Sequence, residues 1–308
     1  MSVAGKHVIL VTGADLAEQA LSLVGDYEVV YAGKAPTEDD LVALCKRYDP
    51  AAIIVRYGRV GARVMDAAPS LKVISKHGSG TDTIDKAAAA ARGIQVAAAA
   101  GANAAAVAEQ AMALVLACAK SVVRLDARIR TGHWDKPTHK SLELAGRTLG
   151  LVGLGAIGLR VARMAHAMDM TVIGVDPLAS NLPPYVRAVD LDAVWTGSDV
   201  ISLHCPLTKD NAGFVNAQAL ARCKRGVILV NTARGGLIDE AALVAALHSG
   251  QVSAAGLDTF EVEPMRPGHP FVAEANLVLS PHIGGVTSDA YVNMGVASVK
   301  NALAVLAG

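Results

Sequence analysis

Short apolar, β-branched segments alternate with helix-patterned segments along this chain, and the alternation occurs in two series. The first series contains the strand-like segments "HVILVTG", "YEVVYAG", "AAIIVRYG", "LKVISKHG" and "IQVAAA". Short buried strands separated by helices form βαβ units, which build a parallel sheet. The sequence up to residue 100 therefore predicts one complete α/β domain of about five strands.

The second series follows a segment from Asn103 to about Ile129 that has helical spacing and contains no Gly or Pro. It comprises "TLGLVG", "TVIGVD", "DVISLHCP", "GVILVNTA", "AAGLDTF" and "LVLSPHIGG", and it extends to about residue 286. A series of this size suits a doubly wound sheet of about six strands. Residues 287–308 predict one further helix, and because one helix cannot form a domain, we expect it to pack on the first series.

The segment "GLVGLGAIG" at residues 150–158 carries the spacing Gly-x-Gly-x-x-Gly between a strand-like run and a helical one. In a nucleotide-binding fold, Gly153 would form the turn, Gly155 would let a pyrophosphate approach, and Gly158 would let the helix pack on the strand. In a chain with 29 glycines this motif is weak evidence by itself. The residues that follow it must therefore support the assignment.

Asp176 ends the next strand-like segment, "TVIGVD". An acidic side chain at this point would accept hydrogen bonds from both hydroxyls of an adenosine ribose. The following "DPLASNLPP" offers no Arg or Lys to a 2′-phosphate, so NAD is favoured over NADP. The alternative is that Asp176 only ends its strand, at the turn before Pro177.

Three downstream residues, Arg234, Glu263 and His282, each lie at or just beyond the end of a predicted strand, the edge at which open α/β sheets bind ligands. An arginine can hold a carboxylate with a bidentate fork and polarise the neighbouring carbonyl. A histidine can protonate an alkoxide, and a glutamate bonded to it fixes its tautomer and favours its protonated form. The trio suits reduction of a 2-oxo acid. Taken singly, each residue also has a structural explanation, as a loop cap, a solvated acid and a core histidine.

The 28 Lys and Arg residues balance the 28 Asp and Glu residues without a basic run, so we expect no nucleic-acid or membrane partner. The four cysteines lie far apart and predict neither a disulfide framework nor a metal site. The N-terminal apolar run is too short for a signal peptide. The run at 111–119 is far shorter than the roughly 20 residues that span a bilayer. These features predict a cytoplasmic protein.

Seven segments, matching in order and spacing over nearly the whole chain, resemble the D-isomer-specific 2-hydroxyacid dehydrogenases, including the D-3-phosphoglycerate dehydrogenases. They are "GSGTDTID", "NAAAVAEQAMALVL", "GLVGLGAIG", "HCPLT", "VNTARGGLIDEAAL", "GLDTFEVEP" and "SPHIGG". Because the sequence ends at Gly308, we expect a short form without the regulatory domain of longer phosphoglycerate dehydrogenases.

The resemblance implies an NAD-dependent oxidoreductase that interconverts a small D-2-hydroxy acid and its 2-oxo acid, with 3-phosphoglycerate or glycerate and hydroxypyruvate as candidates. We expect an α/β protein of two domains. Residues 1–100 and 287–308 would form a flavodoxin-like substrate domain, and residues 101–286 an inserted Rossmann domain, with hinges near residues 100 and 286. The resemblance also implies that the long helix starting near Asn103 pairs two subunits in a homodimer.

The resemblance places the substrate-binding Arg, the His-orienting Glu and the acid/base His on Arg234, Glu263 and His282. It also implies that Asp258 contacts the nicotinamide carboxamide. The full set of cofactor-binding candidates is Gly153, Gly155, Ala156, Ile157, Gly158, Asp176, His204, Pro206, Thr208, Thr232, Ala233, Asp258 and Gly284. The substrate-binding candidates are Arg56, Tyr57, His77, Gly78, Ser79 and Gly80.

Two departures limit what the resemblance implies for this chain. Ala106 replaces the Ser of "NxxSVAE", and Arg56 is followed by Tyr57 where phosphoglycerate dehydrogenases tend to have Ser. The family pattern therefore does not identify the residues that would bind the far end of the substrate. Arg56, Lys76 and His77 would still bring positive charge to strand ends, which makes a second anionic group on the substrate plausible.

Two other functions compete with this hypothesis. An NAD(H)-sensing dimer of the corepressor type would share the fold, but would need a partner-binding surface that the sequence does not reveal. A formate dehydrogenase would pair its His with Gln, and Glu263 argues against it. The sequence identifies neither the R group of the substrate nor the physiological direction.

Overall fold

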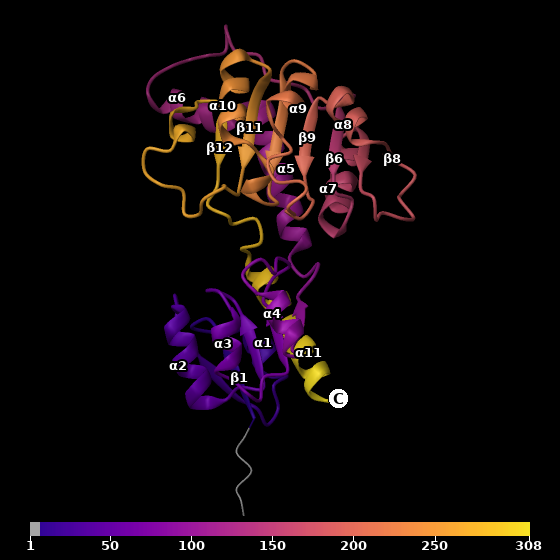
Figure 1. Cartoon of the computed structure of the whole chain (residues 1–308). Coiled ribbons are helices and arrows are strands. Elements are labelled where there is room, and N and C mark those ends of the chain that lie inside the picture. Colours follow the sequence, from indigo (N-terminus) through magenta and orange to yellow (C-terminus); the bar gives the residue numbers. More distant parts are fainter. Residues whose placement is uncertain (1–6) are drawn as a thin grey trace, which may run out of the picture. The chain divides into compact units, whose positions relative to one another are not determined.

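The computed structural model describes residues 7–308 and divides them into two compact units (Figure 1). Unit 1 runs through Asn103 and resumes at Gly285–Gly308, and unit 2 is Ala104–Gly284. The expected boundaries, near residues 100 and 286, lie a few residues from these breaks. The functional roles given to the two domains stay predictions.

Unit 1 is built on a five-stranded parallel sheet, which confirms the expected flavodoxin-like half. Its strands are β1 (Val8–Val11), β2 (Glu28–Tyr31), β3 (Ala52–Val55), β4 (Val73–Lys76) and β5 (Gln95–Ala98), in the order β2-β1-β3-β4-β5. This is the flavodoxin-like order, in which the chain reverses direction across the sheet between β1 and β3. Its helices are α1 (Glu18–Leu21), α2 (Glu38–Tyr48), α3 (Ala62–Asp66), α4 (Lys86–Ala91) and α11 (Ser288–Leu306).

The last helix, α11, belongs to unit 1, as its sequence predicts. Thr287 caps its first turn by accepting a hydrogen bond from the Ala290 amide, 3.0 Å away. The helix packs against α1, β3, β4 and β5. Val299 and Ala302 are fully buried there, in one cluster with Ile9 and Ile54. Burial of this apolar side fixes a segment distant in sequence onto the first sheet.

Unit 2 carries a seven-stranded parallel sheet in the order β12-β11-β10-β9-β6-β7-β8. Its strands are β6 (Thr148–Val152), β7 (Thr171–Val175), β8 (Val186–Ala188), β9 (Val200–Leu203), β10 (Val227–Asn231), β11 (Val252–Leu257) and β12 (Leu277–Leu279). Its helices are α5 (Ala104–Lys120), α6 (Val122–Arg130), α7 (Ala156–Ala167), α8 (Leu191–Gly197), α9 (Ala217–Arg222) and α10 (Glu240–Ser249), with 3₁₀ turns η1 (Gly235–Leu237) and η2 (Pro270–Ala273). The doubly wound sheet is confirmed. The count of about six strands omits β8, which is three residues long and lies at the sheet edge.

The segment expected as one long helix is two helices. Helix α5 (Ala104–Lys120) ends at Ser121, whose φ of 52° is left-handed, and α6 (Val122–Arg130) continues at an angle of 57°. A left-handed residue cannot continue an α-helix, and none of the residues of α6 is buried, so no core contact holds it in line with α5. No single helix within residues 7–308 is long and apolar enough to cross a membrane, although the bent pair α5 and α6 passes on length and composition.

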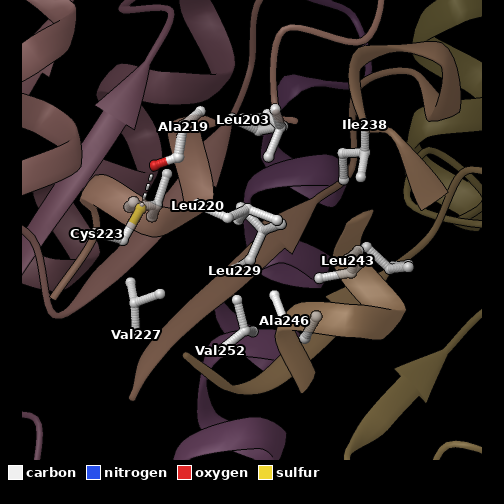
Figure 2. Close-up of a cluster of buried hydrophobic side chains, with 14 of the residues drawn as sticks. Leu203, Ala219, Leu220, Cys223, Val227, Leu229, Ile238, Leu243, Ala246 and Val252 are labelled. Atoms are coloured by element: carbon white, nitrogen blue, oxygen red, sulfur yellow. Dashed lines mark hydrogen bonds between the residues drawn. The ribbon is translucent and has the colours of Figure 1, made fainter. Parts of the chain in front are cut away.

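The core of unit 2 lies between its sheet and the helices that cover it. Leu229 and Val252 on β10 and β11 meet Leu220, Leu243 and other side chains of α9 and α10 (Figure 2). On the side of α5, a Cβ at Gly256 would lie 2.7 Å from Leu114 Cβ, so the absence of a side chain lets helix and strand pack closely. The four cysteines are free, and three of them are buried.

Candidate active site

The carboxyl ends of the parallel strands of unit 2 gather the predicted residues at one edge of the sheet. The chain moves outward from β6 to β7 and β8 and then returns to β9 on the other side of β6. Such a switch point opens a crevice where α/β sheets bind ligands. The strands end, in sheet order, near His282 (β12), Asp258 (β11), Arg234 (β10), His204 (β9), Gly153 (β6) and Asp176 (β7).

The turn between β6 and α7 has the geometry of an anion cradle. Gly153 has a φ of 100°, and a Cβ there would lie 2.7 Å from the His204 carbonyl. A Cβ on Gly158 would lie 2.1 Å from the Gly153 oxygen, whereas a Cβ on Gly155 would meet nothing within 4 Å. Gly153 and Gly158 are thus required by the fold, and Gly155 leaves open space at the N-terminus of α7. Ala156 and Ile157 form the first turn of that helix, where free amides favour a phosphate.

Asp176 follows β7 and forms a hydrogen bond with the turn between β6 and α7. Its carboxylate accepts hydrogen bonds from the Leu154 and Leu178 amides, both at 2.9 Å. A carboxylate has acceptor capacity for more than two donors, so these bonds are compatible with ribose hydroxyls on the remaining lone pairs. Leu178, beside it, is 92% exposed.

His204 is a neutral side chain beneath the glycine turn. Its Nε2 lies 2.9 Å from the Ser202 hydroxyl, and its buried Nδ1 has no hydrogen-bond partner. Burial lowers the pKa of His204 to about 4. It therefore carries no charge toward a phosphate at neutral pH.

The other cofactor candidates lie on loops after β9 and β10. The Thr208 amide donates to Asn211 Oδ1 at 2.7 Å, and Asn211 Nδ2 donates to the Pro206 carbonyl at 2.8 Å. The hydroxyl of Thr232 is buried without a partner. This hydroxyl lies at the same sheet edge as the glycine turn, and a bound cofactor can supply its missing hydrogen bond. The residues present therefore fit a dinucleotide.

Asn231 is a structural residue of the candidate site that sequence reasoning missed. It is fully buried at the end of β10, where its Oδ1 accepts from the Ala233 amide at 2.9 Å and its Nδ2 donates to the Arg234 carbonyl at 2.8 Å. These bonds fix the turn that presents Arg234, whose Nη1 donates to the Ala233 carbonyl at 2.7 Å. A polar Asn ending the apolar run "GVILV" was the available signal.

His282 and Glu263 form a pair. His282 Nδ1 lies 2.7 Å from Glu263 Oε2, and the other oxygen of Glu263 accepts from the Phe260 amide at 3.1 Å. A carboxylate at Nδ1 places the proton of the neutral ring on that nitrogen and leaves Nε2 as the second exchange site. The imidazole is 48% exposed. The pair can therefore take up and release a proton at Nε2.

Asp258 holds the segment that carries His282. Only 1% of Asp258 is exposed, and its carboxylate accepts from the Ser280 hydroxyl at 2.6 Å, the Ile283 amide at 3.0 Å and the Gly284 amide at 2.8 Å. Its carbonyl accepts from the His282 amide at 2.8 Å. Asp258 and Gly284 are thus hydrogen-bonded to each other. Their contacts with the cofactor stay predictions.

The predicted substrate residues lie at the carboxyl edge of the sheet of unit 1. Arg56 and Tyr57 follow β3, and His77 to Gly80 follow β4. Ser79 donates its hydroxyl hydrogen bond to Asn103 Oδ1 at 3.0 Å, and Gly78 has a left-handed φ of 145°. One expectation needs correction. Burial, together with the charges of Arg56 and Lys76, lowers the pKa of His77 to about 4, so this histidine is neutral at pH 7 and adds no positive charge.

Within residues 7–308, no group of three or more His, Cys, Asp or Glu side chains could hold a metal ion.

The carboxyl edge of the sheet of unit 2 combines an anion cradle, a carboxylate-bonded histidine and an arginine. This set can bind a dinucleotide and exchange a proton with a small anionic substrate.

Comparisons with known proteins agree with this description. Residues 112–284 match the family model described as D-isomer specific 2-hydroxyacid dehydrogenase, NAD binding domain. The chain is 42% identical over 266 residues to a hydroxypyruvate reductase of Thermotoga maritima, covering 85% of this chain and 86% of that protein. It is 38% identical over 264 residues to a D-3-phosphoglycerate dehydrogenase of Archaeoglobus fulgidus, covering 84% of this chain but only 50% of that protein.

Among solved structures, the TT0316 protein from Thermus thermophilus superimposes with a TM-score of 0.89 at 38% identity, covering 98% of this chain and 97% of that chain. The match extends over both sheets, and the family model covers the whole edge from the glycine turn to Gly284. The protein belongs to the D-isomer-specific 2-hydroxyacid dehydrogenase family, and unit 2 contains that family's NAD-binding domain.

Proposed function

We propose that this protein catalyses the reversible, NAD-linked interconversion of a small D-2-hydroxy acid and its 2-oxo acid. The observation that carries the proposal is the 2.7 Å contact between His282 Nδ1 and Glu263 Oε2 at the sheet edge that also holds the glycine turn. A binding protein needs the turn but has no use for a histidine oriented by a carboxylate. The chain spans half of the length of the D-3-phosphoglycerate dehydrogenase that it matches. Both 3-phosphoglycerate and glycerate are candidate substrates.

The proton chemistry belongs to His282 and Glu263. NADH, when bound, supplies the hydride that reduces the carbonyl carbon. His282 donates the proton from Nε2 to the carbonyl oxygen, which becomes the hydroxyl, and the ring is left neutral with its other proton on Nδ1. Glu263 stabilises the protonated ring beforehand and keeps it in one orientation. In the oxidative direction, Nε2 takes the hydroxyl proton back.

Arg234 binds the carboxylate that all 2-hydroxy acids share. A guanidinium forms two parallel hydrogen bonds with a carboxylate, and its planar geometry positions the adjacent carbonyl better than a lysine would. The turn fixed by Asn231 sets the position of Arg234 relative to β10. The substrate would therefore be anchored by a group that does not itself transfer a proton.

The cofactor is held by the turn at Gly153, Gly155 and Gly158, by the first turn of α7 and by Asp176. Loops after β9 and β10 complete the site. The carboxylate of Asp176 favours ribose hydroxyls and repels a 2′-phosphate, which supports NAD over NADP.

We infer a homodimer in the cytoplasm as the physiological form. Exposed apolar side chains gather on α6 and the loop after it: Val122, Val123, Ile129 and Trp134 are 53% to 71% exposed. An apolar surface of this kind favours contact with a partner. The balanced charge of 28 basic and 28 acidic residues supports neither a nucleic-acid nor a membrane partner.

The test measures NADH oxidation with glyoxylate, pyruvate, hydroxypyruvate, phosphohydroxypyruvate and oxaloacetate, each repeated with NADPH. We expect turnover of at least one 2-oxo acid, and His282→Ala should lower kcat by roughly 10²–10⁴-fold, as for loss of an acid/base group, with NADH binding retained. His248→Ala is the matched control, because His248 Nε2 also lies 2.7 Å from a glutamate, Glu274, but on an exposed surface. NADH binding without oxidation of any of the five acids would favour an NAD(H)-sensing protein.

A further inference from the structure

The sheet of unit 1 has a switch point of its own. In the order β2-β1-β3-β4-β5, the chain leaves β1 toward β2 and returns to β3 on the other side. Ligands of open parallel sheets bind beyond the carboxyl ends of the strands at such a point. The segments that leave these two strands are Thr12 to Asp15 after β1 and Arg56 to Gly58 after β3.

Arg56 is held at this point by several contacts. Its Nη1 donates to the Asp15 carbonyl at 2.6 Å and forms an ion pair with the Asp15 carboxylate. The guanidinium carbon lies 4.9 Å from the centre of the Tyr291 ring and 5.4 Å from that of Tyr57. The arginine side chain crosses Gly13, where a Cβ would come within 2.9 Å of Arg56 Cδ. Only 13% of the arginine side chain is exposed.

Asp15 is the exposed member of the ion pair. Its side chain is 66% exposed, and the Tyr291 hydroxyl donates to its Oδ1 at 2.9 Å. Hydrogen bonds from Arg56 and Tyr291 lower the pKa of Asp15. A carboxylate that stays ionised therefore stands at the solvent side of Arg56.

The carboxylate of Asp15 is the exposed charge at the switch point. Asp15 offsets Arg56, and His77 is neutral because burial lowers its pKa to about 4. The Lys76 ammonium donates to the Arg56 carbonyl at 3.1 Å. A ligand group that enters here meets an exposed carboxylate in front of a largely covered guanidinium. A phosphate would be repelled by Asp15 and would have to displace it from Arg56.

We propose that Asp15 is a specificity-determining residue, which makes the carboxyl edge of unit 1 accept an uncharged R group and discriminate against a phosphorylated one. The substrate of this protein is accordingly a 2-hydroxy or 2-oxo acid whose only anionic group is its own carboxylate. This inference rests on the proposed function for the nature of the substrate. The selection works by an unfavourable charge contact with the competing substrate.

The test compares kcat/KM for hydroxypyruvate and phosphohydroxypyruvate, which differ by the phosphate. We expect the wild type to favour hydroxypyruvate, and Asp15→Asn to lower that preference about tenfold, mainly through the KM of the phosphorylated acid, because it removes one like charge near the phosphate. Asp15→Glu retains the charge and should retain the preference. Asp26→Asn, which removes an exposed aspartate of the same unit, is the control. Equal effects of Asp15→Asn on both acids, or a wild type that prefers the phosphorylated acid, would overturn the proposal.

A binding measurement separates this inference from the proposed function. Calorimetric titration of the NADH-loaded protein with D-glycerate and with D-3-phosphoglycerate needs no turnover. A gain in phosphoglycerate affinity in Asp15→Asn supports the role of Asp15 even if no acid is reduced, in which case the catalytic proposal alone fails. Turnover of 2-oxo acids together with unchanged relative affinities overturns the role of Asp15 and leaves the catalytic proposal intact.

Discussion

The glycines of the turn after β6 differ in why each position needs a glycine, although the sequence motif does not distinguish them. Gly158 has no room for a methyl group, because a Cβ would lie 2.1 Å from the Gly153 oxygen. Gly155 has a φ of −74° and open space where a Cβ would stand. Protein packing therefore requires Gly158, whereas only a bound ligand would require Gly155.

Alanine at these two positions should consequently give opposite results. Gly158→Ala forces backbone apart and should cost about 1–3 kcal/mol or more in unfolding free energy, as overpacking does. Gly155→Ala should cost at most about 1 kcal/mol, the scale of a poor N-cap, while NADH binding weakens by at least about tenfold. Urea unfolding and NADH fluorescence titration measure the two effects. Wild-type NADH affinity in Gly155→Ala would contradict a pyrophosphate at this position.

The loop after β12 shows how one element depends on another for its function. Asp258, at the end of β11, bonds to both sides of His282 along the chain: to Ser280 before it and to Ile283 and Gly284 after it. His282 itself has a left-handed φ of 54°, a conformation that costs free energy in a non-glycine residue. The buried carboxylate compensates this strain and keeps the imidazole next to Glu263.

Asp258→Asn distinguishes this holding role from a direct cofactor contact. It sets an amide group against donors that need an acceptor, and should cost about 1–3 kcal/mol in unfolding free energy. We expect turnover to fall with it, while NADH binding is retained. Ser280→Ala, which removes one hydrogen bond of the same network, should cost only about 1 kcal/mol. Weaker NADH binding at unchanged stability would instead favour the carboxamide contact.

Elements buried on both sides were predictable from sequence, and elements at the periphery were not. The strands β6, β9 and β10 read as continuous apolar runs because helices cover both faces of a parallel sheet. The three residues of β8 pair with β7 alone, so a short edge strand leaves no comparable pattern. The break at Ser121 was missed because it depends on α6 having no buried residue, which the helical spacing of Leu125 and Ile129 does not reveal.

At the scale of the whole molecule, the position of the glycine turn in mid-chain follows from how the two units are connected. Unit 2 is inserted between β5 and α11 of unit 1. The order of motifs was readable because each catalytic candidate follows a strand, and parallel strands bring their carboxyl ends to one edge. The neutral state of His77 and the pairing of Arg56 with Asp15 were not readable, since both depend on contacts between residues far apart in sequence.

The proposed dimer is a property of the whole molecule that α6 should control. Val122 and Ile129 are seven residues apart and share a face of α6. Val123 on the same helix and Trp134 on the loop after it are also exposed. A stable interface buries about 1,200–2,000 Å² in total, and apolar side chains at its centre supply most of the affinity. Charges placed on this region should therefore dissociate the dimer without unfolding the monomer.

Light scattering on Val123→Asp/Trp134→Ser measures this directly. We expect the wild type at twice the chain mass of 31.6 kDa and the double variant at that mass, with the folded content unchanged by circular dichroism. Val272→Asp is the matched control, because Val272 is 65% exposed in the same unit but lies on η2, and it should remain dimeric. Because Arg234, Glu263 and His282 all come from one chain, the monomeric variant should keep its proton-transfer residues. A wild type that is monomeric, or a double variant that stays dimeric, would exclude α6 as the interface.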